Sequence, residues 1–140
     1  MAHFERDGIA FQYPETWTLT PETYDSGWAV ALFSPGTAFL SLSLDTSGSP
    51  PSLLVDATLA ALRDEYPQLD DDPVTDSLAN LPALGHDVQF IALDLTNTCW
   101  VRAIAVSGGT LLVYWQVSDL EEQNQQVLRA ICASLTVQDE

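Results

Sequence analysis

Short apolar segments separated by turn-forming residues constrain the fold of this chain more than any other feature of its sequence. Asp7-Gly8 lies between two such segments, and glycine tolerates the positive φ that a two-residue hairpin turn requires. Residues 107–110, Ser-Gly-Gly-Thr, join the segments 100–106 and 111–117 in the same way. Because hairpins place neighbouring strands antiparallel, the sequence predicts a mainly antiparallel sheet.

About seven segments have the composition and length of strands. They span residues 4–6, 9–13, 28–33, 38–44, 86–95, 100–106 and 111–117. A further short strand over 17–20 would end at Pro21. The run 28–33 is apolar at every position, which predicts a strand buried on both faces. Apolar residues also occupy both faces of the segment 100–106, which predicts a sheet covered on both sides.

Two segments have the spacing of amphipathic helices. The first begins at the prolines of 50–51, ends before Pro67, and carries one apolar stripe formed by Val55, Leu59, Leu62 and Tyr66. The second begins at a capping box over 118–121. Its predicted buried stripe consists of Leu120, Val127, Leu128 and Ile131.

These elements predict a single domain over residues 1–140 with an α+β fold. It is a mainly antiparallel sheet of about seven strands sandwiched by two helices. Hydrophobic residues make up 46% of the chain, which is enough for a packed core and excludes general disorder. The sequence leaves open whether the helices cover one face of the sheet or both.

The charge of the chain excludes several classes of function. It has 20 acidic residues, four arginines and no lysine, for a net charge of −16. Such a chain repels nucleic acid, and it has no lysine for a Schiff base or a phosphate site. The acidity serves solubility or steers a basic partner; a salty habitat is a third explanation, although 17% charged residues is low for it.

The N-terminal residues lack the pattern of a signal peptide, and no apolar run is long enough to span a bilayer. We therefore expect a cytoplasmic protein without a membrane span. In that compartment Cys99 and Cys132 are expected as reduced thiols, with a disulfide as the rarer alternative.

The segment 68–77 concentrates negative charge around Pro73 and predicts an exposed loop between two halves of the domain. Its carboxylates are the candidate contact for a basic protein partner: Asp70, Asp71, Asp72 and Asp76. The alternative is a solvated turn without a specific role. The segment lacks the glycine and the terminal glutamate of an EF-hand loop, so we expect no calcium site.

No catalytic, cofactor or metal site is predicted elsewhere. His3, His86, Cys99 and Cys132 do not have the spacing of zinc ligands. His86 is the one plausible internal base, and nothing in the sequence activates Cys99 as a nucleophile, so structural roles are expected for both. Arg102 lies on a predicted central strand, where we expect it to pair with an acid rather than to face a cleft.

The segment 7–17 resembles the opening of the PsbP-like superfamily, in which a glycine and a short strand precede Tyr-Pro-x-x-Trp. Here these residues are Gly8, Tyr13, Pro14 and Trp17. The order of elements is similar over the whole chain, including a glycine at 85 before a three-stranded meander and Ser134-Leu135 after the last helix. In this motif Pro14 ends the strand, and Trp17 is expected in the core.

The resemblance implies an α/β/α sandwich that serves non-enzymatic tasks. Members include an extrinsic subunit of photosystem II, a Ran-binding transport factor and Eag-type chaperones that hold membrane segments of secreted effectors. We therefore expect a non-enzymatic cytoplasmic binding or accessory protein that recognises a protein partner through an acidic surface. The alternatives are a chaperone for an apolar segment of a secreted effector, and a small-molecule binder or weak enzyme using a cleft between sheet and helix.

Overall fold

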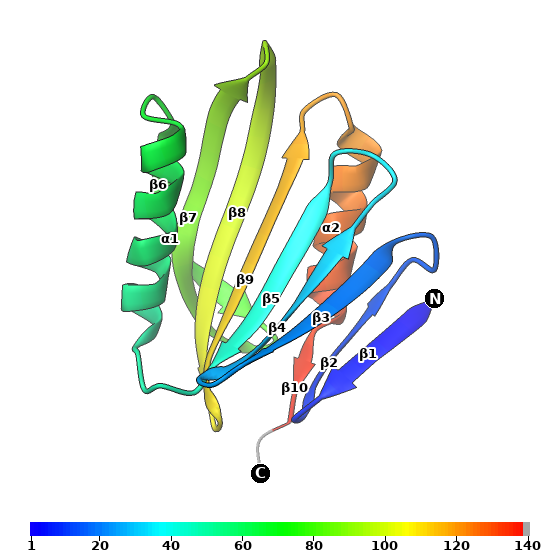
Figure 1. The fold of residues 1–140 in the computed structure, drawn as a ribbon, viewed down its shortest axis with the longest axis vertical. Coiled ribbons are helices and arrows are strands. Elements are labelled where there is room, and N and C mark those ends of the chain that lie inside the picture. Colours follow the sequence, from blue (N-terminus) through cyan, green and yellow to red (C-terminus); the bar gives the residue numbers. More distant parts are fainter. Residues whose placement is uncertain (139–140) are drawn as a thin grey trace.

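The computed structural model describes residues 1–138 and contains two antiparallel sheets and two helices, which confirms the predicted α+β fold (Figure 1). The large sheet has seven strands in the order β3-β4-β5-β9-β8-β7-β6. Their bounds are Thr18–Tyr24 for β3, Gly27–Phe33 for β4, Phe39–Asp45 for β5, Asp70–Leu78 for β6, Leu81–Ala92 for β7, Leu95–Val106 for β8 and Gly109–Ser118 for β9.

A small sheet joins the two ends of the described chain. It pairs β1 (Ala2–Arg6) with β2 (Ile9–Tyr13), and β2 with β10 (Thr136–Val137). The predicted two-residue turn is confirmed, with positive φ of 53° at Asp7 and 80° at Gly8. The sequence did not predict that these first strands form a sheet separate from the rest.

The two helices lie on opposite faces of the large sheet. Helix α1 (Pro51–Glu65) contacts β7, β8 and β9, and its Val55 packs on Val101 and Ala103. Helix α2 (Glu122–Ser134) contacts β9 and β2, and it lies behind the sheet in Figure 1. The layers are therefore α/β/α, with the small sheet beside α2.

The main core lies between the large sheet and the layer of α2 with the small sheet. Trp17 is 6% exposed in this core, as the sequence predicted. The ring of Phe4 stacks on Phe11 at 5.1 Å, and the indole nitrogen of Trp28 donates to Asp7 at 2.8 Å. These contacts fix the first hairpin on the sheet.

Both edge strands of the large sheet contain a proline that the sequence analysis treated as a strand end or a loop. Pro21 lies within β3, so the predicted end of a strand at that residue is wrong. Pro73 lies within β6, so the predicted loop over 68–77 is also wrong. An edge strand accommodates proline because one of its sides needs no backbone N–H donor.

The predicted boundary between strands β7 and β8 is wrong as well. The turn is formed by Leu93 and Asp94, both with positive φ, and not by residues 96–99. Leu-Asp is not among the residue pairs that favour such a turn, so the sequence carries no signal there.

The predicted capping box is not formed, because Ser118 belongs to β9 and α2 begins at Glu122. Instead the carboxylate of Glu121 accepts hydrogen bonds from the backbone N–H of Thr37 at 2.9 Å and from Asn124 at 2.7 Å. Leu120, predicted in the buried stripe, is 78% exposed.

Each helix covers only part of its face, which leaves two uncovered regions. We call the α2 side of β6–β8 the acidic half-face; it carries Asp70, Asp72, Asp76, Asp87, Gln89 and Trp100. We call the α1 side of β4 and β5, up to Ser43, the uncharged half-face; it carries Ala29, Ala31, Phe33, Phe39, Ser41 and Ser43, and the carboxylates of Glu22 and Asp45 lie at its margin. No helix lies in front of β3–β5 in Figure 1. The prediction that 28–33 is buried on both faces is therefore wrong, since Phe33 is 48% exposed.

Candidate acidic cleft

The acidic half-face and the edge of α2 enclose a cleft of about 540 Å³. We call it the acidic cleft because carboxylates from several elements line it: Asp70, Asp72, Asp87, Asp119 and Glu122. Its base contains the indole rings of Trp100 and Trp115. Arg129 of α2 also lines the cleft, so the acidic residues of its lining outnumber the basic one by five to one. A concave site that combines such an excess of negative charge with aromatic rings is suited to a cationic ligand.

Successive side chains of β6 point to opposite faces of the sheet, and this determines which of the four predicted contact residues reach the cleft. Asp70, Asp72 and Asp76 share the α2 side of the strand, while Asp71 projects to the α1 side. Of these four residues, Asp70 and Asp72 line the cleft. Their role as a partner contact stays a prediction.

Asp71 and Asp76 hold the edge strand in place. Asp71 forms an ion pair with Arg63 of α1 at 2.6 Å, and its other oxygen lies 2.9 Å from Nδ1 of His86. Asp76 accepts hydrogen bonds from Nε of Arg102 at 3.1 Å to each of its oxygens. Both carboxylates are thus neutralised within the protein.

Arg102 is 2% exposed and pairs with acids, as the sequence predicted. Besides Asp76 it donates to Asp87 at 2.9 Å and to the backbone carbonyls of His86 and Val101 at 3.1 and 2.9 Å. Gly85 lies directly opposite Arg102 in the neighbouring strand, where a Cβ would be 1.8 Å from a carbonyl oxygen. The glycine therefore allows the close approach of β7 to β8 and leaves the space that the guanidinium crosses to reach β6.

Two arginines lie over the indole rings at the base of the cleft. Trp100 and Trp115 are cross-strand neighbours with centroids 6.0 Å apart and planes at 11°. Arg102 lies 4.5 Å from the Trp100 centroid, and Arg129 of α2 lies 5.4 Å from that of Trp115. These cation–π contacts place each guanidinium against the face of an indole ring, where the negative face of the ring attracts it.

Four carboxylates of the cleft keep their charge uncompensated. Within residues 1–138 no ion pair is formed by Asp70, Asp72, Asp119 or Glu122. Asp119 accepts a hydrogen bond from the hydroxyl of Thr98 at 2.6 Å. Sequence reasoning missed Asp119 and Glu122, because they reach the cleft only through the fold.

The residues that a thiol enzyme would need are held in structural roles. Cys99 is buried on the α1 side, where burial raises the pKa of its thiol to about 11. Cys132 lies on α2, and burial raises the pKa of this thiol to about 12. Both are free and lie on opposite sides of the sheet, so the alternative of a disulfide is wrong. At neutral pH both thiols stay protonated and are poor nucleophiles.

A second hollow of about 400 Å³ lies where α1 meets the uncharged half-face. It is lined by Phe39, Tyr114 and residues of α1 that include Thr58 and Ala61. Phe33, Phe39 and Tyr114 form a row of rings with centroids 6.4 and 5.9 Å apart. The sequence analysis missed this surface because it predicted β4 as covered on both faces.

Comparison of the sequence with protein-family models and with curated proteins finds no match. Among solved structures, the chain is similar to LpqN of Mycobacterium tuberculosis, a protein involved in cell envelope biogenesis. That match has a TM-score of 0.55 and 15% identity, and covers 92% of this chain and 82% of LpqN. It is also similar to cyanobacterial PsbP (CyanoP) of Synechocystis sp. PCC 6803, with a TM-score of 0.53, 13% identity, and coverage of 98% and 92%.

The chain has a PsbP-like fold. The resemblance inferred from Gly8, Tyr13, Pro14 and Trp17 is thus confirmed at the level of the fold. At sequence identities of 15% and 13%, the two structures share the PsbP-like architecture with this chain, and no functional residue is transferred from them. Neither helix of the described residues is long and apolar enough to cross a membrane.

Proposed function

We propose that this chain is a non-enzymatic, cytoplasmic binding or accessory protein that recognises a basic segment of a protein partner through the acidic cleft. The observation that carries the proposal is the convergence of Asp70, Asp72, Asp119 and Glu122 on one concave surface, where none of them forms an ion pair with a residue of the described range 1–138. Carboxylates from three separate elements are held together there, although like charges repel one another.

The electrostatics of the whole chain favour a cationic partner. The net charge is −16, and two of the four arginines, Arg63 and Arg102, are paired with aspartates. The resulting negative field attracts lysine and arginine side chains and repels phosphates. Because the cleft is open to water, the attraction is screened by salt over about 10 Å at 0.1 M.

The two protonated thiols support the proposed cytoplasmic location, and the fold supports the proposed accessory role. Free cysteines are typical of a reducing compartment, which supports a cytoplasmic location. The involvement of LpqN in cell envelope biogenesis is compatible with an accessory task for a PsbP-like domain.

The test is capture of partners from the source cells at low and at moderate salt, using the purified protein as bait. The cleft variant combines Asp70→Asn, Asp72→Asn and Glu122→Gln, and leaves the ion-paired Asp71 and Asp76 intact. A partner that binds the native protein should be lost in this variant and at moderate salt, and should bind again as a purified protein.

The matched control removes three exposed charges elsewhere, through Glu15→Gln, Asp25→Asn and Asp56→Asn. It should retain the partner. If the control and the cleft variant lost the partner equally, the effect would be one of net charge, and recognition by the cleft would be contradicted.

A second candidate function is supported by the uncharged half-face, which could shelter an apolar segment of a secreted effector. Phe33 is 48% exposed beside Phe39 and the small side chains of Ala31 and Ser41, so an apolar helix could approach the sheet closely. A chaperone of this kind would bind the dye ANS in its native state and lose that binding in Phe33→Ser. Its partner would persist at moderate salt and in the cleft variant.

A further inference from the structure

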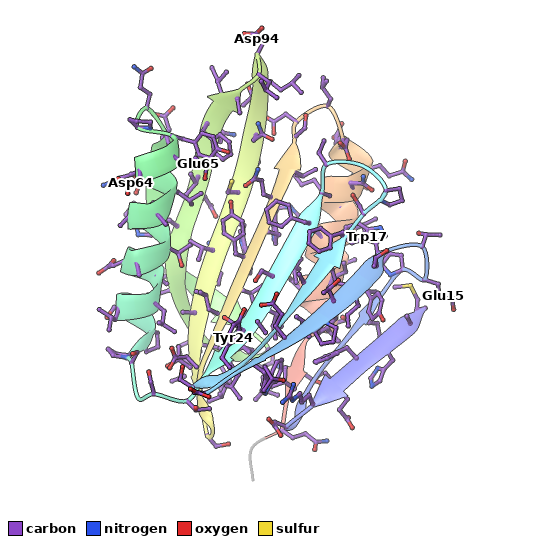
Figure 2. All side chains as sticks on the ribbon, in the orientation of Figure 1. Glu15, Trp17, Tyr24, Asp64, Glu65 and Asp94 are labelled. Carbon is purple, nitrogen blue, oxygen red and sulfur yellow. The ribbon has the colours of Figure 1, made fainter. Side chains whose placement is uncertain are left out.

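The hairpin of β7 and β8 extends beyond the other elements (Figure 1). It exposes aliphatic side chains at its end. Ile91 is 73% exposed, Leu93 is 96% exposed and Leu95 is 37% exposed. Figure 2 labels Asp94 at the outermost point of this hairpin. We call Ile91, Leu93, Asp94 and Leu95 the hairpin tip.

The positive φ of the backbone at position 93 is unfavourable for leucine. Three hairpins of the chain have two-residue turns with both φ values positive, formed by Asp7-Gly8, Ala79-Asn80 and Leu93-Asp94. Asparagine and glycine suit such turns, whereas a bulky side chain at positive φ is strained. Leu93 has a φ of 51° and packs on nothing that would offset the strain. Strain of this kind persists most often at functional surfaces.

The hairpin tip adjoins the acidic cleft. A hollow of about 470 Å³ at its base is lined by Glu65, Asp70, Gln89, Phe90 and Ile91, among others. Asp70 and Gln89 also line the acidic cleft, so the two hollows adjoin at these residues. Glu65 and Asp70 line this hollow together with Ile91, Asp94 lies in the turn beyond it, and no arginine of the described chain is part of its lining.

We propose that the hairpin tip and the acidic cleft together bind a basic amphipathic helix of a protein partner. Its aliphatic side chains contact Ile91 and Leu93, and its lysines or arginines meet Asp70, Asp72 and Asp94. This assignment rests on the proposed function and specifies the class of its partner. Charge complementarity excludes a second copy of this chain and an anionic bilayer, because both would bring negative charge to a negative surface.

The test uses two synthetic peptides of equal length and charge, one of leucine and lysine with helical spacing and one of glycine and lysine. Both are titrated by calorimetry against the native protein and Leu93→Asn, which keeps every charge of the tip. The leucine–lysine peptide should bind the variant about tenfold more weakly, as expected for loss of one buried aliphatic anchor. The glycine–lysine peptide should bind both proteins equally.

The same variant should have a higher urea midpoint than the native protein, because asparagine relieves the strain at positive φ. The matched control is Ala79→Asn in the turn between β6 and β7, which has the same backbone conformation. It should leave the affinity for both peptides unchanged.

Unchanged affinity of Leu93→Asn for the leucine–lysine peptide would overturn the role of the hairpin tip. If both peptides still bound the cleft variant more weakly, recognition by the acidic cleft would be retained without a role for the hairpin tip. If neither peptide responded to the cleft variant, the proposed function would fail as well. Binding to phosphatidylcholine vesicles that Leu93→Asn abolishes would assign the tip to a lipid surface and contradict a protein helix.

Discussion

The acidic half-face and the uncharged half-face belong to one sheet, yet different interactions hold them. On the acidic half-face, one buried guanidinium joins three strands through Asp76, Asp87 and backbone carbonyls. On the uncharged half-face, short side chains such as Ala31 and Ser41 leave the backbone ladder as the main support. The acidic half-face thus depends on a single internal cation, whereas the uncharged half-face contains no comparable polar network among the described residues.

The largest effect is expected from removing that cation. Arg102→Ala should destabilise the protein by about 3 kcal/mol in urea unfolding, since it deletes a buried side chain and leaves Asp76 and Asp87 without a partner. The two carboxylates are 40% and 53% exposed and can hydrate, which keeps the cost below that of a fully buried pair.

Arg129→Ala is the matched control, because Arg129 is exposed, has a cation–π contact with Trp115, and forms no ion pair within residues 1–138. It should change stability by less than about 1 kcal/mol. Similar losses in both variants would mean that the acidic half-face does not depend on Arg102.

A smaller loss of stability is expected when Gly85, the glycine opposite Arg102, is replaced. Gly85→Ala places a Cβ 1.8 Å from the carbonyl oxygen of Val101, so β7 and β8 must separate. We expect a cost of about 2 kcal/mol in thermal or urea unfolding. Gly108→Ala is the control, because its Cβ meets nothing within 4 Å and should be tolerated. Equal tolerance at both positions would contradict the role assigned to Gly85.

Neutralising one carboxylate of the acidic half-face should stabilise the free protein. Asp72 lies directly opposite Asp87 across β6 and β7, and like charges in such a pair repel. Asp72→Asn should therefore add about 0.5 kcal/mol at low salt, and less as salt screens the pair. Asp56→Asn on α1 should bring no such gain. A destabilised Asp72→Asn would show that this carboxylate serves the fold and not a partner.

The smallest effect concerns Glu121, which belongs to neither half-face. The hydroxyl and N–H of Thr37, followed by Asn124, hold the pKa of this carboxyl below its ordinary value of 4.5. Its contribution to stability is complete above pH 4.5 and is lost as pH falls through the lowered pKa. Glu121→Gln should remove this part of the acid dependence in unfolding curves measured downward from pH 5, while partner affinity at neutral pH stays constant.

Much of the fold could be predicted because its turns and helices carry local signals. Asp7-Gly8 and residues 107–110 supply glycines where hairpins need them, and the stripe at Val55 and Leu59 matches a helix buried on one side. Arg102 was predicted to pair with an acid because a charge on a central strand requires compensation.

The features that were not predicted depend on tertiary contacts, which no local sequence pattern indicates. Prolines 21 and 73 interrupt a strand in general but are tolerated at an edge, and the position of a strand in the sheet is a tertiary property. The turn at Leu93 could not be predicted because its residues oppose the conformation they adopt. The acidic cleft required Asp119 and Glu122 to meet β6, so only Asp70 and Asp72 were found from sequence.

The closing of the small sheet by β10 has a consequence for how the protein is made. Thr136 and Val137 pair with Ala10 and Ile9, and the N–H of Gln138 donates to Gly8 at 2.8 Å. A ribosome that has released the first hairpin must therefore synthesise almost all of the described chain before that hairpin gains its third strand. Contacts between such distant segments form slowly, so we expect the small sheet to be completed in a late step of folding.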